Sequence, residues 1–219
     1  MPINFTAILI ATFIPLIIGF MWYNPKFGFG KAWMQATGIT QEDEKKANMV
    51  LMFSLTILFS FFVAFIMQTI VIHQFHIYNF LHEQKDFAEP NSLSSALLTQ
   101  IMDTYAGSYR SFKHGALHGT MAGIFLALPI ISINALFEMK GAKYVAINAG
   151  YWIVSMALMG GVICAMMWSH SPCFCHRFCL FCKVFDSSIF YLLFWSILSN
   201  IVLYYYGCIF LRLTIIKKK

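Results

Sequence analysis

Two histidines four residues apart are the clearest candidates for chemistry in this sequence. His114 and His118 belong to the stretch KHGALHG, and residues four apart share one face of a helix. This spacing lets two imidazoles bind one metal ion. The glutamate of an H-E-x-x-H zinc motif is missing, so Asp103, on the preceding segment, is the candidate for a third ligand. Because two ligands do not make a metal site, the sequence favours histidines that hydrogen-bond to neighbouring helices. Such a pair could also sense pH, since the unperturbed pKa of imidazole is about 6.5.

Three further polar residues lie within or beside apolar stretches, where polar side chains are costly and often functional. Asn134 and Glu138 are four apart on one helix face, and Asn148 follows across the short MKGAK turn. With the two histidines they could line a transport path. We favour hydrogen bonds between helices, because no buried pair of acidic residues marks a proton relay.

The sequence contains no pattern that identifies an enzyme. We find no nucleophile beside a base, no phosphate-binding loop and no pair of catalytic carboxylates. Four cysteines lie close together near the C-terminus, but the second C-x-x-C pair of a zinc site is missing and we assign them no role: Cys173, Cys175, Cys179 and Cys182. We therefore expect no cofactor, and a metal-dependent membrane enzyme is the least favoured function class.

The composition indicates a membrane protein. Of the 219 residues, 59% are hydrophobic and 11% are charged, against about 25% charged residues in soluble domains. Lipid must then solvate the surface, and only helices or closed barrels satisfy their backbone there. The apolar runs are longer than barrel strands, which indicates helices. The net charge of +6 does not imply a nucleic-acid partner, because Lys and Arg gather in the cytoplasmic loops of membrane proteins.

Apolar stretches of about 20 residues, the length that crosses the hydrocarbon core, divide the chain. We expect an all-α membrane bundle in which residues 1–168 form a domain of four core helices, at residues 5–23, 49–72, 116–137 and 144–167. Residues 169–219 form an atypical Cys-rich and apolar extension with a candidate fifth helix at 189–211. This extension is either a genuine part of the fold or an out-of-frame addition.

Three glycines repeat every four residues along the helix that carries the histidines. Small residues at the spacing of Gly115, Gly119 and Gly123 let helix backbones touch in lipid. We interpret these glycines as a packing seam, either within one chain or between two copies in a homo-oligomer.

An aromatic, glycine-rich segment follows the first apolar stretch. In GFMWYNPKFGFGKAW, the rings of Trp22, Tyr23 and Trp33 suit the lipid headgroup region, and Pro25 helps to start a turn. We interpret the segment as an interfacial elbow with an aromatic belt, and a binding role is the alternative.

A second amphipathic pattern lies in the long loop between the second and third apolar stretches. Leu93, Leu97, Ile101 and Tyr105 follow one another at steps of four, which makes one apolar stripe on a helix. We expect this helix to lie on the bilayer surface. A substrate lid is the alternative.

Several motifs together resemble a known family. The tryptophan-containing elbow, H-G-x-x-H-G at residues 114–119, Asn-Ala-Leu-Phe-Glu at 134–138 and Ile-Asn-Ala-Gly-Tyr at 147–151 resemble the bacterial membrane proteins grouped as domain of unknown function 1761. The resemblance covers residues 3–168 and implies a compact protein with about four membrane helices. It implies no activity, because none is established for the family, and so it transfers no catalytic residue.

The distribution of basic residues predicts the orientation. Ten of the fifteen Lys and Arg residues lie on one side of a five-helix arrangement. By the positive-inside rule this side is cytoplasmic, so the N-terminus is outside and the C-terminus inside a bacterial inner membrane. We expect a multi-pass integral membrane protein of unknown biochemical function that acts as a structural or interaction bundle, with the lipid bilayer as its partner and no known substrate. A small transporter or channel is the alternative.

The orientation can be tested by cysteine labelling in intact cells. A cysteine introduced at Thr40 should be protected from a membrane-impermeant thiol reagent, because the lysine-rich 24–48 loop is expected in the cytoplasm. Labelling of that cysteine in unbroken cells would reverse the predicted orientation.

Overall fold

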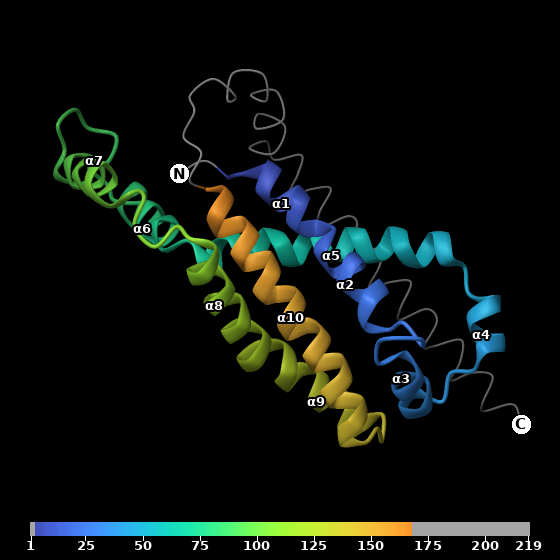
Figure 1. Cartoon of the computed structure of the whole chain (residues 1–219). Helices are drawn as coiled ribbons and strands as arrows, with labels where there is room; N and C mark the ends of the chain where they lie inside the picture. Colours follow the sequence, from blue (N-terminus) through green and yellow to red (C-terminus); the bar gives the residue numbers. More distant parts are fainter. Residues whose placement is uncertain (1–2, 168–219) are drawn as a thin grey trace, which may run out of the picture. The chain divides into compact units, whose positions relative to one another are not determined.

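The computed structural model describes residues 3–167, and every regular element in that range is a helix (Figure 1). Four helical stretches are long and apolar enough to cross a membrane: Phe5–Trp22, Met49–Val71, Phe112–Phe137 and Ala142–Met166. The predicted all-α membrane bundle with four core helices is therefore confirmed. The candidate fifth helix and the four-cysteine cluster lie outside the described residues.

Two spans are single helices, two are composite, and shorter helices connect them. Along the chain the elements are α1 (Phe5–Thr12), α2 (Ile14–Trp22), α3 (Gly30–Thr37), α4 (Gln41–Lys46), α5 (Met49–Val71), α6 (His73–His82), α7 (Leu93–Tyr105), α8 (Phe112–Ala122), the π-helical turn η1 (Gly123–Ala127), α9 (Leu128–Phe137) and α10 (Ala142–Met166). The first span is α1 with α2, and the third is α8, η1 and α9. Helices α6 and α7 pack against each other as a hairpin between the second and third spans.

The third span begins at Phe112, earlier than the apolar pattern indicates. Ser111 caps this helix, since its side-chain oxygen accepts a hydrogen bond of 3.3 Å from the backbone N–H of His114. Hydropathy alone assigns Lys113 and His114 to a loop, whereas the cap recruits them into the first turn of α8. His114 and His118 therefore lie on one continuous helix.

Prolines divide the first and third spans. Pro15 stands in the first turn of α2, just after the break at Phe13, and Pro129 stands in the first turn of α9, just after η1. Proline lacks an N–H and its ring clashes with the preceding turn, so the helix before it breaks or widens. The first span therefore consists of two successive helices, α1 and α2, and the third of α8 and α9 joined by η1.

Helix α10 lies at the centre of the bundle. It contacts α1, α2, α5, α8 and α9. Half of the residues in its most apolar 18-residue stretch are buried, against 11% of those in the corresponding stretches of the second and third spans. In Figure 1, α8 and α9 run alongside α10, while α5 crosses it obliquely. The other three spans are thus organised around this one helix.

Three glycines hold α8 against α10. A Cβ atom added at Gly115 would overlap the carbonyl oxygen of Gly160, and one added at Gly119 would overlap that of Met156. A Cβ atom added at Gly123 would overlap the Cα atom and side chain of Ile153, also on α10. Because the contact is between backbones, it leaves room for no side chain. We refer to this contact of Gly115, Gly119 and Gly123 with α10 as the glycine seam.

Hydrogen bonds between distant segments define one end of the bundle. The Lys140 ammonium donates to the carbonyl oxygen of Thr37 at 2.9 Å, and that of Lys143 donates to Oε1 of Gln35 at 3.3 Å. The turn before α10 and the helix α3 therefore lie at the same end. The α6–α7 hairpin lies at the opposite end (Figure 1).

Because of the glycine seam, we expect a substitution at a glycine to lower stability more than the truncation of a large apolar side chain. Replacing Gly119 by Leu should lower stability by about 1–3 kcal/mol or more, because the new side chain would separate α8 from α10. Replacing Leu117 by Ala should cost less, because Leu117 is 58% exposed on the lipid-facing side and lipid tails are as apolar as leucine. Thermal aggregation temperatures in one detergent compare the two variants. Equal temperatures, or a less stable Leu117 variant, would contradict the importance of the seam.

Candidate metal centre

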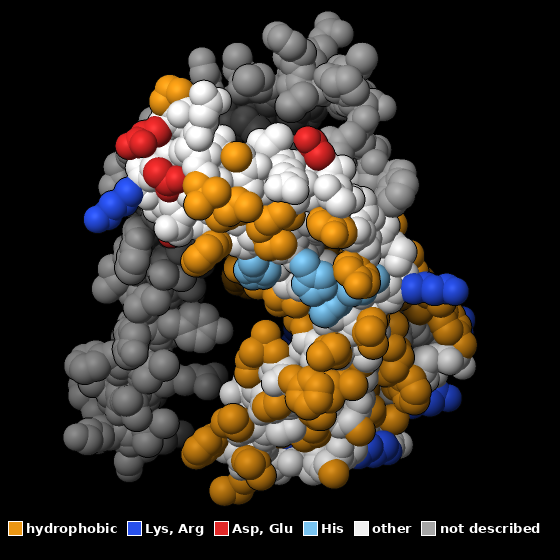
Figure 2. All heavy atoms as spheres, turned by 90° about the vertical axis from the view of Figure 1, so that its left-hand side faces the viewer, with side chains coloured by type: hydrophobic (Ala, Val, Ile, Leu, Met, Phe, Trp, Pro, Cys, Tyr) orange, Lys and Arg blue, Asp and Glu red, His pale blue; other side chains and the backbone are white. Residues whose placement is uncertain are grey.

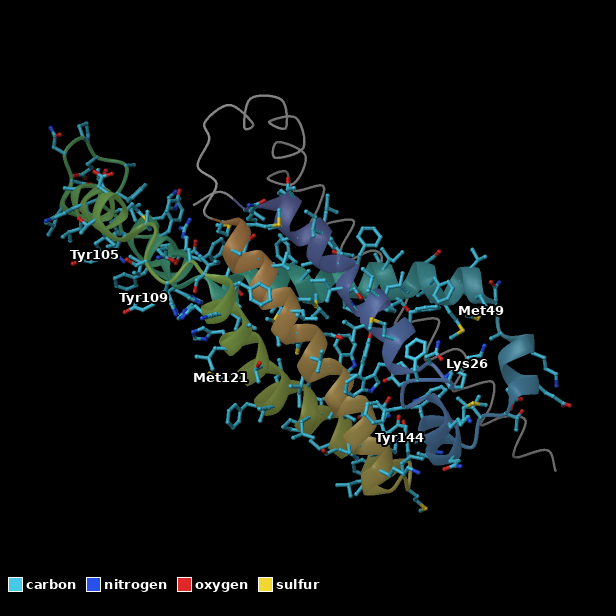
Figure 3. The ribbon with its side chains drawn as sticks, in the orientation of Figure 1. Lys26, Met49, Tyr105, Tyr109, Met121 and Tyr144 are labelled. Atoms are coloured by element: carbon cyan, nitrogen blue, oxygen red, sulfur yellow. The ribbon has the colours of Figure 1, made fainter. Side chains whose placement is uncertain are left out.

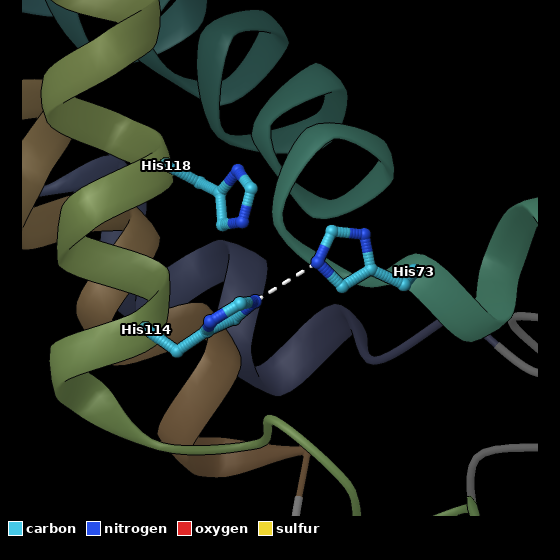
Figure 4. Close-up of side chains that lie close together, drawn as sticks. All are labelled: His73, His114 and His118. Carbon is cyan, nitrogen blue, oxygen red and sulfur yellow. Dashed lines mark hydrogen bonds between the residues drawn. The ribbon is translucent and has the colours of Figure 1, made fainter.

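Three histidines from two separate parts of the chain converge at one end of the bundle. The metal-binding ring atoms of His73, His114 and His118 all lie within 4.8 Å of one another. The Nε2 atoms of His73 and His114 are 2.9 Å apart, and the three ring centroids are 4.5–5.0 Å apart. Figure 4 shows the three rings facing a common centre, two from α8 and one from the start of α6.

The glycine seam orients two of the three imidazoles. Gly115 and Gly119 directly follow His114 and His118 in the sequence, and both glycines are buried against α10. Successive residues of a helix are about 100° apart around its axis. The two histidines therefore lie together at the edge of the seam, half-buried, on the side of α8 that faces His73.

The third imidazole comes from a break between two helices. Helix α5 ends at Val71, Ile72 is extended with φ −108° and ψ 98°, and His73 is the first residue of α6. The His76 ring donates a hydrogen bond of 2.8 Å from Nε2 to the carbonyl oxygen of Thr69, since a carbonyl can only accept. This bond spans the break and satisfies a carbonyl of the last turn of α5. It thereby helps to hold His73 beside α8.

The cluster fits the inner ligand shell of a transition metal. Zinc binds imidazole nitrogen at about 2.0–2.1 Å, so two ligands of a tetrahedral site are about 3.3 Å apart. The 2.9 Å pair and the 4.8 Å upper limit bracket this separation. The His73 side chain is exposed, and a small rotation of its ring would bring the three nitrogens to this spacing. Between His73 and His114, one ring donates a hydrogen bond and the other accepts it.

A cavity of about 390 Å³ adjoins the cluster. Its walls come from α6, from the end of α7 and from the loop after α7, and include His73, Gln74, Ile77, Ile101, Tyr105 and Tyr109. His73 therefore belongs to both the cluster and the cavity. Figure 3 shows the labelled tyrosines of this wall at the end of the molecule opposite Lys26 and Tyr144.

A buried glutamine holds the wall of this cavity together. The amide nitrogen of Gln74 donates to the carbonyl oxygens of Tyr105 at 3.1 Å and Ser108 at 2.9 Å. One side chain of α6 thus ties down both the end of α7 and the loop that follows it.

Tyr109 has a backbone conformation that residues other than glycine seldom adopt, with a φ of 62°. The thiol of Cys164 on α10 donates a hydrogen bond of 3.3 Å to its carbonyl oxygen. The ring centroid of Tyr109 lies 5.2 Å from that of His114 and 6.3 Å from that of His73. Such left-handed residues concentrate at functional sites, and here the conformation places an aromatic ring beside the imidazoles.

Other candidate residues from the sequence lie apart from the cluster. Asp103 is exposed on α7 and is not one of the clustered ligands. Asn134 and Glu138 are exposed near the far end of the third span. The helix rises roughly 24 Å between His118 and Asn134, at 1.5 Å per residue. These two polar residues and the histidines therefore do not line one site.

The aromatic segment packs on α10. The indole N–H of Trp22 donates to a backbone carbonyl of α10 at 3.1 Å, and the hydroxyl of Tyr23 donates to Oδ1 of Asn148 at 3.0 Å. Trp33 contacts the Tyr23 ring edge-on at 5.4 Å, and Pro25 is exposed in the intervening turn. Burial raises the pKa of Tyr23 far above its usual value. Asn148 thus joins this segment to the fourth span by a neutral hydrogen bond.

His73 is not among the site residues expected from the sequence. A signal was present, because His73 is the first polar residue after the second apolar stretch and so stands at a membrane boundary. His114 stands at the boundary where the third stretch begins. Consecutive spans run in opposite directions, so the end of the second span and the start of the third lie at the same membrane face. This shared membrane face limits which residues can lie beside His114. Whether His73 and His114 meet still depends on how α5 and α8 pack.

Comparison with known proteins identifies a family and no function. A family model described as "Protein of unknown function (DUF1761)" matches residues 6–164, which include all three histidines. The family resemblance expected from the sequence motifs is therefore confirmed. No curated protein and no solved structure matches the chain.

The role of Gln74 can be tested by hydrogen exchange. Replacing Gln74 by Leu removes two hydrogen bonds, each with a net value of about 0.5–1.5 kcal/mol, and leaves two carbonyls without that partner. Amide exchange in residues 105–110 should accelerate. The control is Gln84→Leu, which removes only an exposed hydrogen bond to the Phe80 carbonyl. Equal exchange in both variants would show that Gln74 does not hold the cavity wall.

Proposed function

The chain belongs to the DUF1761 family of proteins of unknown function, and we propose that it is an integral membrane protein that binds a divalent transition-metal ion through His73, His114 and His118. The observation that carries this proposal is the convergence of three imidazoles from the boundaries of two spans. Histidine is the commonest metal ligand among side chains, and three of them are enough to hold one ion.

The ligand set favours particular metals and an open site. Imidazole suits zinc, copper, iron and nickel, whereas calcium and magnesium prefer oxygen ligands. Structural zinc sites are closed by four protein ligands, while catalytic sites have three ligands and keep one position open for water or substrate. The cluster in residues 3–167 consists of three histidines, which corresponds to the open kind. A bound ion would act there as a Lewis acid or lower the pKa of a bound water.

A structural or interaction bundle is the second candidate. The tight packing of α8 on α10 supports it, and so do the neutral hydrogen bonds that join distant segments. The glycine seam is occupied by α10 of the same chain, so a homo-oligomer would need a different surface. A transporter has less support, because Asn134 and Glu138 lie far from the histidines along the third span.

The predicted orientation also assigns the proposed centre to one side of the bilayer. The positive-inside rule puts the end that carries Lys140 and Lys143 in the cytoplasm. The histidines lie at the opposite end of the third span. We therefore place the metal centre near the outer surface of the membrane, with the bilayer as the principal partner of the spans.

Metal binding is testable on the purified full chain after removal of any affinity tag. We expect cobalt(II) to give a visible ligand-field spectrum, and zinc to displace it. Single changes of His73, His114 or His118 to Ala should each weaken binding at least tenfold, since even outer-shell partners cost about 10–100-fold. The matched control is His82→Ala, which removes another histidine of α6 from outside the cluster.

The cysteine-rich extension calls for a separate criterion. Cobalt bound to thiolates has a charge-transfer band that an all-imidazole site lacks, so the histidine-dependent signal should appear without that band. If the three cluster variants retain the cobalt affinity of the parent chain and of His82→Ala, the proposed metal centre is wrong.

A further inference from the structure

The cavity beside the histidines is positioned to receive a ligand from the bilayer. Resting on the metal centre proposed above, we propose that the ligand that completes the metal coordination is a single-chain amphiphile with an anionic oxygen head group. Its head would bind the ion and its chain would occupy the cavity formed between α6, α7 and the loop after α7. Four observations support this assignment: the level of the site, the apolar rim, the absence of carboxylates from the wall, and the cavity size.

The site lies at the level where two spans meet the membrane boundary. His73 follows α5 by two residues, and His114 is in the first turn of α8. On α8, Leu117 lies between the two histidines and Met121 one turn after them, and their side chains are 58% and 45% exposed. Side chains exposed on a membrane span face lipid. The histidines therefore border lipid-facing surface directly.

The rim of the cavity is apolar on the other side as well. Ile77, Tyr105 and Tyr109 are between 37% and 71% exposed, and the stripe continues along α7 through Leu93 and Leu97. Figure 2 shows the histidines between hydrophobic side chains on both sides, separated by them from the acidic side chains of the hairpin. An amphipathic helix of this kind lies in the membrane interface with its apolar face toward the acyl chains. The cavity thus opens onto a surface that an alkyl chain can cross without entering water.

The charge of the site favours an anion. Three neutral imidazoles leave both charges of a divalent ion uncompensated, and the residues that line the cavity include no carboxylate. An anionic ligand in the remaining coordination position would offset this charge, which neutral ligands alone leave on the ion. A carboxylate or a phosphate monoester supplies the hard oxygen atom and the charge together.

The volume of the cavity favours one chain. At about 390 Å³ it falls near the lower end of the range of about 300–1,000 Å³ that is typical of small-molecule pockets. Each methylene group that leaves water for such an apolar wall strengthens binding roughly fourfold. A ligand with a medium-length chain should therefore bind at least tenfold more tightly than the same head group without a chain.

The test uses the cobalt-loaded full chain in nanodiscs of a neutral phospholipid, with the cobalt spectrum as the readout. Decanoate and decyl phosphate are titrated as anionic amphiphiles, acetate and inorganic phosphate as the same head groups without a chain, and decanol as the same chain without a charge. We expect a spectral shift with one or both anionic amphiphiles at a concentration at least tenfold below that of the matching chain-free anion. A response to decanoate alone indicates a fatty-acid-like ligand, and a response to decyl phosphate alone a lysophosphate-like one.

Variants in which a larger side chain fills the cavity are the control for partition of the amphiphile into the nanodisc lipid. Ile101→Trp should leave the cobalt spectrum intact, because Ile101 is outside the histidine cluster, and should reduce the advantage of the chain at least tenfold. Ile77→Trp tests the same point from α6 if the first variant does not fold. Equal responses to decanoate and acetate, a matching response to decanol, or wild-type behaviour of the folded Trp variants would overturn this inference while leaving the metal centre intact. Loss of the metal centre itself would appear earlier, as a cobalt spectrum that does not depend on the three histidines.

Discussion

The backbone contact between α8 and α10 is the constraint on which the rest of this structure depends. Between helices in lipid there is no hydrophobic driving force, so association rests on close packing and on polar contacts. Gly115 and Gly119 allow that packing by bringing α8 against the carbonyl oxygens of Gly160 and Met156. A helix held this closely cannot rotate about its axis. The directions of His114 and His118 are therefore set by the glycines that follow them.

The three imidazoles are held with unequal rigidity. His114 and His118 directly precede glycines that are packed without spare space, whereas His73 is exposed and begins a helix after an extended residue. A rigid pair with one adjustable partner suits a site that gains and loses an ion, because only one ring must move to open it. The hydrogen bond between His73 and His114 already brings this ring of α6 against α8.

Other polar residues of the bundle serve mainly to join segments. Tyr23 bonds to Asn148 between the aromatic elbow and α10, and Gln74 bonds to the end of α7. Such neutral hydrogen bonds are worth little individually in membrane proteins, on average about 0.6 kcal/mol, but they select one arrangement of helices. Hydrogen bonds of this kind hold the wall of the cavity through Gln74 and the position of Tyr109 through Cys164. The histidine cluster is thus supported by contacts of α10 with the aromatic segment, with α8 and with the loop after α7.

The sequence by itself determined the local properties of this protein. Long apolar stretches had to become membrane helices because lipid offers the backbone no hydrogen-bond partner. The glycines repeat every four residues, so the helical period puts them on one face of their helix. Hydropathy placed the start of the third span too late, because it cannot register the Ser111 cap that brings His114 into the helix. The tertiary structure alone decided that α10 is the partner of the glycines and that His73 joins His114 across 41 residues of chain. Periodic patterns in the sequence show which residues share one face of a helix. Which face of another helix they contact depends on how all the helices pack together.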